Sequence, residues 1–372
     1  MAWQPCRSSA GFYMAFLVEV MALSFTRFPG ASSVPAPPPN HAPAPGALPD
    51  YAELHCLSNF SFQRGASHPQ ELVERAHELG YQALALTDEC SVAGVVRAHG
   101  VAKKRGFHLI LGSEFLWGEL RMVVLARNAN GWGNLCEFIT AARAAAPKGQ
   151  YHAGPLSPWA QLQDCEIVIA PCRSQLDASD LIAVSACISS ARGQFDSYFD
   201  GHVWLAVELH LAPDDSLWLA TLQHVGARLG LPLVATGDVH MHSRQRKPLQ
   251  DVITAVHRGC SVAECGFALQ PNAERHLRRR VRLASIYPPE LLAATLTVAG
   301  RCTFSLDEIK YQYPLETVPQ GMTPTTALAW LAEEGARGRY PQGVPEWITA
   351  RIHKELALIA DCGYEMYFLT VH

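Results

Sequence analysis

Residues 81–114, YQALALTDECSVAGVVRAHGVAKKRGFHLILGSE, have the pattern of one strand–helix–strand unit. The apolar run Ala83–Leu86 has the length of a buried strand, Ser91–Arg105 has helical spacing, and His108–Leu111 is a second buried run. A helix between two buried strands is the crossover unit of a parallel sheet. This unit therefore predicts an α/β fold in which helices lie outside a mostly parallel sheet.

The same alternation continues on both sides of this unit. Ser67-His68-Pro69 has the pattern of a helix start, and Gly80 that of a helix end. After His240 the alternation gives way to helical patterns, so we place a domain boundary near residues 270–285. The further strands we expect are Met122–Ala126, Glu166–Ala170, Leu181–Ser185, Val203–Leu209, Pro232–Ala235 and the closing run Tyr367–His372, and the further helices are Trp132–Ala145, Asp214–Leu229, Gln245–Arg258, Pro288–Cys302, Thr325–Arg337 and Glu346–Cys362.

The composition of the 372-residue chain is that of a folded protein. Hydrophobic residues make up 49% and charged residues 17%, which allows a sizeable core and excludes wholesale disorder. The formal net charge of −4 argues against bulk electrostatic attraction to nucleic acid. One local basic patch is either a solvated surface or a stripe that contacts phosphates. Its nucleic-acid-binding candidates are Arg275, Arg278, Arg279, Arg280 and Arg282.

The cysteines and the N-terminal segment indicate a cytoplasmic protein that does not associate with a membrane. Eleven cysteines without a CxxC pair are typical of reduced thiols and exclude a zinc ribbon. The apolar segment Gly11–Phe25 superficially resembles a secretion signal, but Glu19 interrupts it and it is too short to span a bilayer. Ala31–Pro49 is rich in Pro and Ala, which predicts a flexible tether. We therefore expect residues 1–50 to be a disordered extension.

Potential metal ligands follow four apolar runs that lie far apart in the chain. They occur in Glu53-Leu54-His55, Thr87-Asp88-Glu89, Gly112-Ser113-Glu114 and Gly237-Asp238-Val239-His240. The carboxyl ends of neighbouring strands meet on one face of an α/β barrel or open sheet. The sequence therefore predicts a candidate metal or phosphate site at that face.

Several of these segments together resemble a known family. YAELHCLSNFSFQRG (51–65), ALALTDECSVAGVVRAH (83–99), LILGSEF (109–115) and LVATGDVHMHSRQRKPLQDV (233–252) resemble the polymerase-and-histidinol-phosphatase (PHP) domain of bacterial C-family DNA polymerases. The variants Glu-Leu-His-Cys-Leu-Ser and Thr-Asp-Glu-Cys resemble the error-prone, damage-induced branch of that family. ECGFALQPNAERHLR, YPPELLAATL and GYEMYFLTVH extend the resemblance to the end of the chain.

The resemblance implies a distorted PHP-type α/β barrel over residues 51–280. A mostly helical segment, 281–372, would lead into the polymerase palm and thumb. The implied activity is translesion synthesis by template-directed nucleotidyl transfer with Mg²⁺, on primer-template DNA and deoxynucleotides, with other translesion proteins and the sliding clamp as partners. The polymerase aspartates would lie beyond this chain, so we expect it to be the front part of a longer protein and inactive alone.

The resemblance also implies where a PHP metal cluster would lie. Leu57 removes one ligand outright, and Arg64 and Arg121 place permanent positive charges where ligands are usual. We interpret the site as degenerate, with ion pairs replacing metals or with one remaining divalent ion. The alternatives are a metal-dependent phosphoesterase or 3′–5′ exonuclease, and a non-catalytic interaction module. The retained ligand positions are His55, Asp88, Glu114, Cys187, Asp238 and His240, and the replaced ones are Leu57, Arg64, Glu89 and Arg121.

Overall fold

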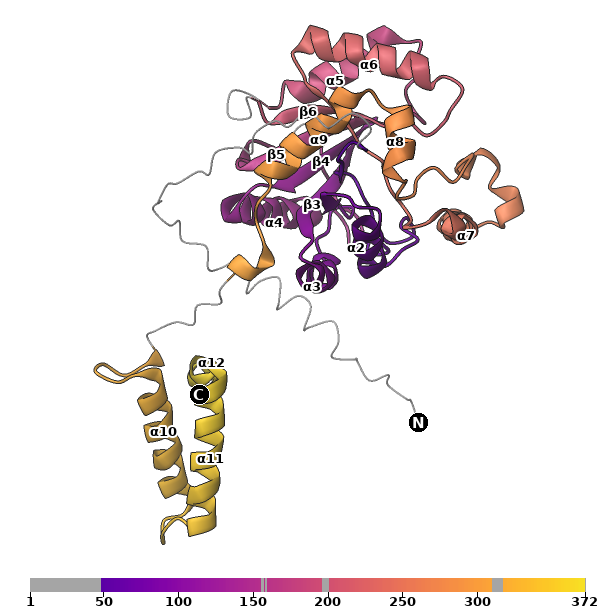
Figure 1. The fold of residues 1–372 in the computed structure, drawn as a ribbon. Coiled ribbons are helices and arrows are strands. Elements are labelled where there is room, and N and C mark those ends of the chain that lie inside the picture. The colour runs from indigo at the N-terminus through magenta and orange to yellow at the C-terminus, as the bar shows by residue number, and fades with distance from the viewer. Residues whose placement is uncertain (1–47, 155–156, 158, 196–200, 310–316, 372) are drawn as a thin grey trace, which may run out of the picture. The chain divides into compact units, whose positions relative to one another are not determined.

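The structure is a computed structural model that describes residues 48–154, 157, 159–195, 201–309 and 317–371. Apart from its last three residues, the expected disordered extension 1–50 lies outside the described residues. The chain divides into two compact units between Glu308 and Ile309 (Figure 1). Each unit is described separately below.

A seven-stranded sheet, with its strands in chain order, forms the centre of the first unit (Figure 1). Its strands run parallel except β4, which is antiparallel to both β3 and β5. The expected α/β architecture with a mostly parallel sheet is therefore confirmed. The strands are β1 (Ala52–Glu53), β2 (Ala83–Leu86), β3 (His108–Trp117), β4 (Leu120–Ala126), β5 (Cys165–Pro171), β6 (Val203–Val207) and β7 (Leu233–Ala235).

The sheet curls so that its two edges meet beyond the carboxyl ends of β1 and β7. There Cys56 and Val239 form a parallel bridge. Leu57 N donates to Val239 O at 2.8 Å, and Val239 N donates to His55 O at 2.9 Å. These bonds bring the segments that follow the two edge strands side by side, as the predicted distorted barrel requires.

Helices cover the outer face of the sheet. Because alternate residues of a strand point to opposite faces, each strand contributes apolar residues both to the layer under these helices and to the inner face. In β2, Leu84 and Leu86 pack with the apolar residues of the outer helices, whereas Ala83 and Ala85 belong to a second, inner cluster. The helices that supply the outer layer are α2 (Pro69–Glu78), α3 (Val95–Arg105), α4 (Ala129–Ala144), α5 (Leu181–Arg192) and α6 (Asp215–Leu229).

The prediction of a strand at Leu181–Ser185 is wrong, because this segment forms the first part of α5. The Asp180 side chain accepts a hydrogen bond from Ala183 N at 2.9 Å, which caps the helix start. Val184 and Ile188 are buried at helical spacing. Periodicity alone cannot distinguish a short apolar run in a strand from one in a buried helix.

Helix α9 (Pro289–Arg301) fills the inner face of the sheet. Val298 and Ala299 join the inner apolar cluster, and Ala52 N donates to Thr295 Oγ1 at 3.1 Å. This helix belongs to the first compact unit, which extends to Glu308. Two further helices of this unit are α7 (Lys247–Arg258) and α8 (Arg280–Ile286).

The second unit is helical, with α10 (Pro324–Arg339), α11 (Glu346–Cys362) and α12 (Glu365–Val371). The expectation of a strand at the closing run is wrong for its described part, which lies in α12. Gly363, at φ 68°, ends α11 in the left-handed conformation and allows the new helix to begin two residues later. None of the helices in the described part of the chain is long and apolar enough to cross a membrane.

Candidate functional site

Three potential ligands from distant segments converge at the carboxyl end of the barrel. His55 follows β1, Glu114 lies in β3, and Asp238 follows β7; one ligand atom from each lies within 4.8 Å of the other two. All three side chains are buried. The arrangement places two carboxylates and an imidazole in the small volume that a metal ion would need.

Both ring nitrogens of His55 are already engaged by carboxylates. Nε2 lies 2.6 Å from Glu114 Oε2, and Nδ1 lies 2.8 Å from Glu208 Oε1. Burial alone would lower the pKa of His55, but the hydrogen bonds to Glu114 and Glu208 raise it to about 9. At neutral pH the ring is therefore an imidazolium that donates from both nitrogens and has no lone pair for a metal.

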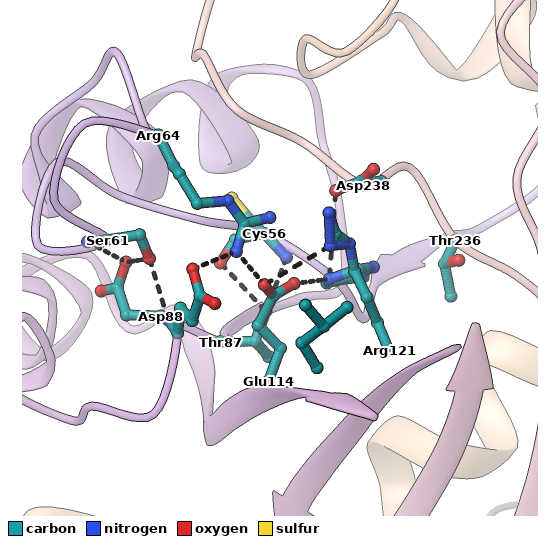
Figure 2. Close-up of polar contacts among 12 residues, drawn as sticks. Cys56, Ser61, Arg64, Thr87, Asp88, Glu114, Arg121, Thr236 and Asp238 are labelled. Carbon is teal, nitrogen blue, oxygen red and sulfur yellow. Dashed lines mark hydrogen bonds and ion pairs between the residues drawn. The ribbon is translucent and has the colours of Figure 1, made fainter. Parts of the chain in front are cut away.

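Arginines occupy the space around Glu114. Arg64 and Arg121 both point toward this carboxylate (Figure 2). Arg64 Nη1 bonds Glu114 and also Glu89 at 2.6 Å, while Arg121 Nη1 lies 3.9 Å from Glu114. Burial alone would raise the pKa of Glu114, but these guanidinium groups and His55 hold it well below its usual range. Glu114 is thus a carboxylate whose charge is compensated by protein cations.

Asp238 is engaged in the same way. Arg275 forms an ion pair with it, and His240 Nε2 lies 3.0 Å from its Oδ1. Burial lowers the pKa of Arg275 to about 10, which leaves the guanidinium charged at neutral pH. Burial, together with the charges of Arg64 and Arg121, lowers the pKa of His240 to about 3, so this ring is neutral. His240 Nδ1 is buried without a hydrogen-bond partner among the described residues.

The charges of this cluster balance without a metal. Its four carboxylates face three guanidinium groups and the His55 imidazolium, which gives four negative and four positive charges. A divalent cation would have to enter beside cations that already hold its ligands, and its own charge would unbalance the site. As they stand, these residues do not fit a cluster of two or three metals. The carboxylates are Glu89, Glu114, Glu208 and Asp238, and the guanidinium groups are those of Arg64, Arg121 and Arg275.

Asp88, a predicted ligand, binds a loop of its own domain. It accepts hydrogen bonds from the N–H and the hydroxyl of both Ser58 and Ser61, at 2.7–3.1 Å. Figure 2 shows Asp88 with Ser61. Four donors occupy its two oxygens, so in this arrangement Asp88 positions the loop and does not join the triad. Leu57, at a replaced ligand position, is fully buried.

Cys187, the remaining predicted ligand, does not lie in the cluster. It sits on α5, where burial and a hydrogen bond to Glu119 raise its pKa to about 11. The cysteine that follows β5 is Cys172, which lines a small cavity of about 40 Å³ together with Glu208, Asp238 and Arg275.

Sequence reasoning also missed Glu208 and His210. Both follow β6, at the end of the predicted strand Val203–Leu209, so the rule that selected the other ligands could have found them. His210 Nε2 lies 2.9 Å from Gly237 O, and its burial together with the charges of Arg275 and Arg278 lowers its pKa well below the usual value. No local pattern marked Arg275 as the partner of Asp238.

The predicted nucleic-acid stripe is broken up by the fold. Arg275 forms an ion pair with Asp238, and Arg278 is only 2% exposed and donates a hydrogen bond to Leu209 O at 2.8 Å. Arg275 is therefore engaged by a carboxylate and Arg278 by a backbone carbonyl. Arg280 pairs with Asp50 at 2.8 Å. Arg279 and Arg282 are exposed and line a groove of about 750 Å³. The same groove is lined by three carboxylates of α2, those of Glu71, Glu74 and Glu78.

Comparisons with known proteins agree with the fold. Residues 53–208 match the family profile of the PHP domain, and residues 326–372 match that of the bacterial DNA polymerase III alpha NTPase domain. The chain is 53% identical over 333 residues to the error-prone DNA polymerase of Dechloromonas aromatica, covering 88% of this chain and 31% of that protein. It is 50% identical over 328 residues to the error-prone DNA polymerase of Methylococcus capsulatus, covering 87% and 30%. The chain thus spans about a third of the length of the curated relatives it matches.

A solved amidohydrolase from Chromobacterium violaceum aligns over 51% of this chain and 87% of its own, with 18% identity and a TM-score of 0.39. A likeness at that level is too weak to bear on function.

Proposed function

We propose that this chain is the N-terminal portion of an error-prone DNA polymerase. It carries a match to the PHP domain and aligns with about a third of the length of polymerases of that name. The whole protein would act in translesion synthesis and damage-induced mutagenesis by template-directed nucleotidyl transfer. Identities of 53% and 50% to two polymerases of that name support this assignment. The match of residues 326–372 to a DNA polymerase III alpha domain extends it into the second unit.

The remaining properties of the parent enzyme follow from the same assignment. Mg²⁺ would serve nucleotidyl transfer, and primer-template DNA and deoxynucleotides would bind domains outside this chain. Other translesion proteins and the sliding clamp would be its partners, and the cytoplasm its location. The chain by itself would not polymerise. If the barrel contacts DNA, Arg279 and Arg282 remain the exposed candidates.

For the barrel we propose a scaffolding role with a degenerate metal site. The observation that carries this proposal is the pairing of Glu114 and Asp238 with arginines, while both nitrogens of His55 are bonded to carboxylates. An ion pair holds two strand ends together with charges that are always present, and it needs no metal. The network would therefore brace the carboxyl end of the barrel.

The second candidate is a metal-dependent phosphoesterase or 3′–5′ exonuclease. The proximity of His55, Glu114 and Asp238 favours it, since a divalent ion that displaced the His55 proton and one guanidinium would find three ligands. Such an ion could activate water for phosphoester hydrolysis. The third candidate is a non-catalytic interaction module. It differs from the scaffold only in that no polymerase domains would accompany it in the parent protein.

Metal content and hydrolysis distinguish the scaffold from the phosphoesterase. Elemental analysis of the chain, purified and then dialysed against Mn²⁺, is expected to find at most about one equivalent of bound metal. Phosphatase and exonuclease assays with Mn²⁺ are expected to show no activity that His240→Ala removes, with Arg337→Ala as a surface control. Two or more bound metals, together with hydrolysis lost in His240→Ala only, would establish the phosphoesterase and refute the degenerate site.

A further inference from the structure

Two thiols are in contact in the loop that follows α7. The sulfur atoms of Cys260 and Cys265 lie 3.4 Å apart. Cys265 is buried, whereas Cys260 is partly accessible. Among the ten cysteines that the structure describes, this is the pair whose sulfur atoms touch. Neither residue contributes to the site at the end of the barrel.

The local backbone holds the two thiols together. Helix α7 ends at Gly259, whose φ of 68° turns the chain back on itself. The Glu264 carboxylate then accepts hydrogen bonds from Ser261 N at 2.9 Å and from Ser261 Oγ at 2.7 Å. This capping box stabilises a single helical turn that returns Cys265 to Cys260. The contact is therefore built into a hydrogen-bonded turn.

We propose that Cys260 and Cys265 form a redox-sensitive pair that a hydroperoxide converts into an intrachain disulfide. A disulfide has a sulfur–sulfur distance of about 2.05 Å, so the two atoms need to approach by roughly 1.3 Å, which side-chain rotation and a small backbone shift can supply. Disulfides in reducing compartments are commonly reversible sensors of this kind.

The chemistry balances with one peroxide per pair. The more accessible Cys260 attacks the peroxide oxygen as a thiolate, which forms a sulfenic acid and releases the other oxygen as water or an alcohol. Cys265 then attacks the sulfenic sulfur, the S–S bond forms, and the hydroxyl leaves as water. The two thiols lose two electrons and two protons, and the peroxide takes up both.

The disulfide would close the turn beside Phe267, whose side chain is fully exposed. In the reduced protein, the hydrogen bonds between Glu264 and Ser261 help to hold this turn, but no covalent bond closes it. Oxidation would therefore fix the conformation of an apolar surface residue, and reduction would release it.

The sequence makes the product easy to detect. Trypsin cleaves after Arg258 and next after Arg275, so the peptide Gly259–Arg275 contains both cysteines. The reduced full chain is treated with hydrogen peroxide, alkylated under denaturing conditions, digested and analysed by mass spectrometry. The expected product is this peptide without alkyl groups and lighter by two hydrogen atoms, which dithiothreitol restores to the doubly alkylated form.

Two variants and one condition complete the test. Cys362→Ser removes an exposed thiol outside the pair and should leave the product unchanged, whereas Cys260→Ser should abolish it. In the urea-unfolded chain the yield should fall several-fold, because the turn no longer holds the sulfurs together. The proposal is overturned if the peptide stays doubly alkylated at peroxide levels that oxidise Cys362, or if unfolding leaves the yield unchanged.

Discussion

Raising the pH should weaken the barrel through one residue, His55. Its pKa rises from 6.5 to about 9 on folding because of its bonds to Glu114 and Glu208, despite the opposing effect of burial. A folded pKa above the unfolded value means that the folded protein binds the extra proton, so its stabilising effect is complete below pH 6.5 and is lost as the pH rises through 9. A difference of this size corresponds to about 3 kcal/mol of unfolding free energy.

The assay is urea unfolding of the wild type and His55→Gln between pH 6 and pH 10, followed by tryptophan fluorescence. Other groups titrate in this range, but they do so in both proteins, so the difference between the two stabilities isolates His55. That difference should shrink by about 3 kcal/mol from pH 6 to pH 10. The His55 ring signal in NMR spectra should titrate with a midpoint near 9.

A difference that does not depend on pH, or a ring midpoint at or below 6.5, would refute the reasoning. Either result would mean that His55 is neutral in the folded protein, so that a nitrogen lone pair is available to a metal. With His55 neutral, the four carboxylates of the cluster would face only three positive charges, so another cation would be needed to balance them.

Three further substitutions test the packing around the site. Arg64→Leu leaves Glu89 and Glu114 without their shared partner and should lower the free energy of unfolding by about 3 kcal/mol, measured by urea unfolding. Arg337→Leu, which breaks an exposed ion pair, should lower it by well under 1 kcal/mol. Equal losses in the two variants would contradict the proposed network. Asp88→Asn should lower the free energy of unfolding by about 2 kcal/mol and speed amide hydrogen exchange at Ser58 and Ser61, because an amide group cannot accept all four hydrogen bonds. Unchanged exchange at these two residues would show that Asp88 does not hold the loop. Gly94→Ala would place a Cβ 2.8 Å from Asp88 Oδ2 and should destabilise the protein by about 1–3 kcal/mol. Gly100 lies inside α3, where an added Cβ meets no atom within 4 Å, so Gly100→Ala should stabilise the protein by about 0.5–1 kcal/mol. Melting temperatures that shift in the same direction in both variants would disprove the steric explanation.

Local pattern was sufficient for most of the fold. Buried strands such as Ala83–Leu86 and helices such as Glu346–Cys362 have the same bounds in the structure as in the prediction. The errors at Leu181–Ser185 and at the closing run concern short apolar segments that are equally compatible with strand and helix. In both cases a neighbouring signal favoured the helix: the Asp180 cap before α5 and the break at Gly363 before α12.

The sequence by itself determined the α/β alternation and the ligand-type residues His55, Glu114 and Asp238 at the strand ends, while the barrel was implied by the family resemblance. These depend on the spacing of apolar residues along the chain and on the geometry that all parallel sheets share. Only the tertiary structure decided what those residues bind. The charge state of His55 depends on Glu208, and the compensation of Asp238 depends on Arg275, partners that folding brings from distant segments into a buried space where each charge requires a neighbour.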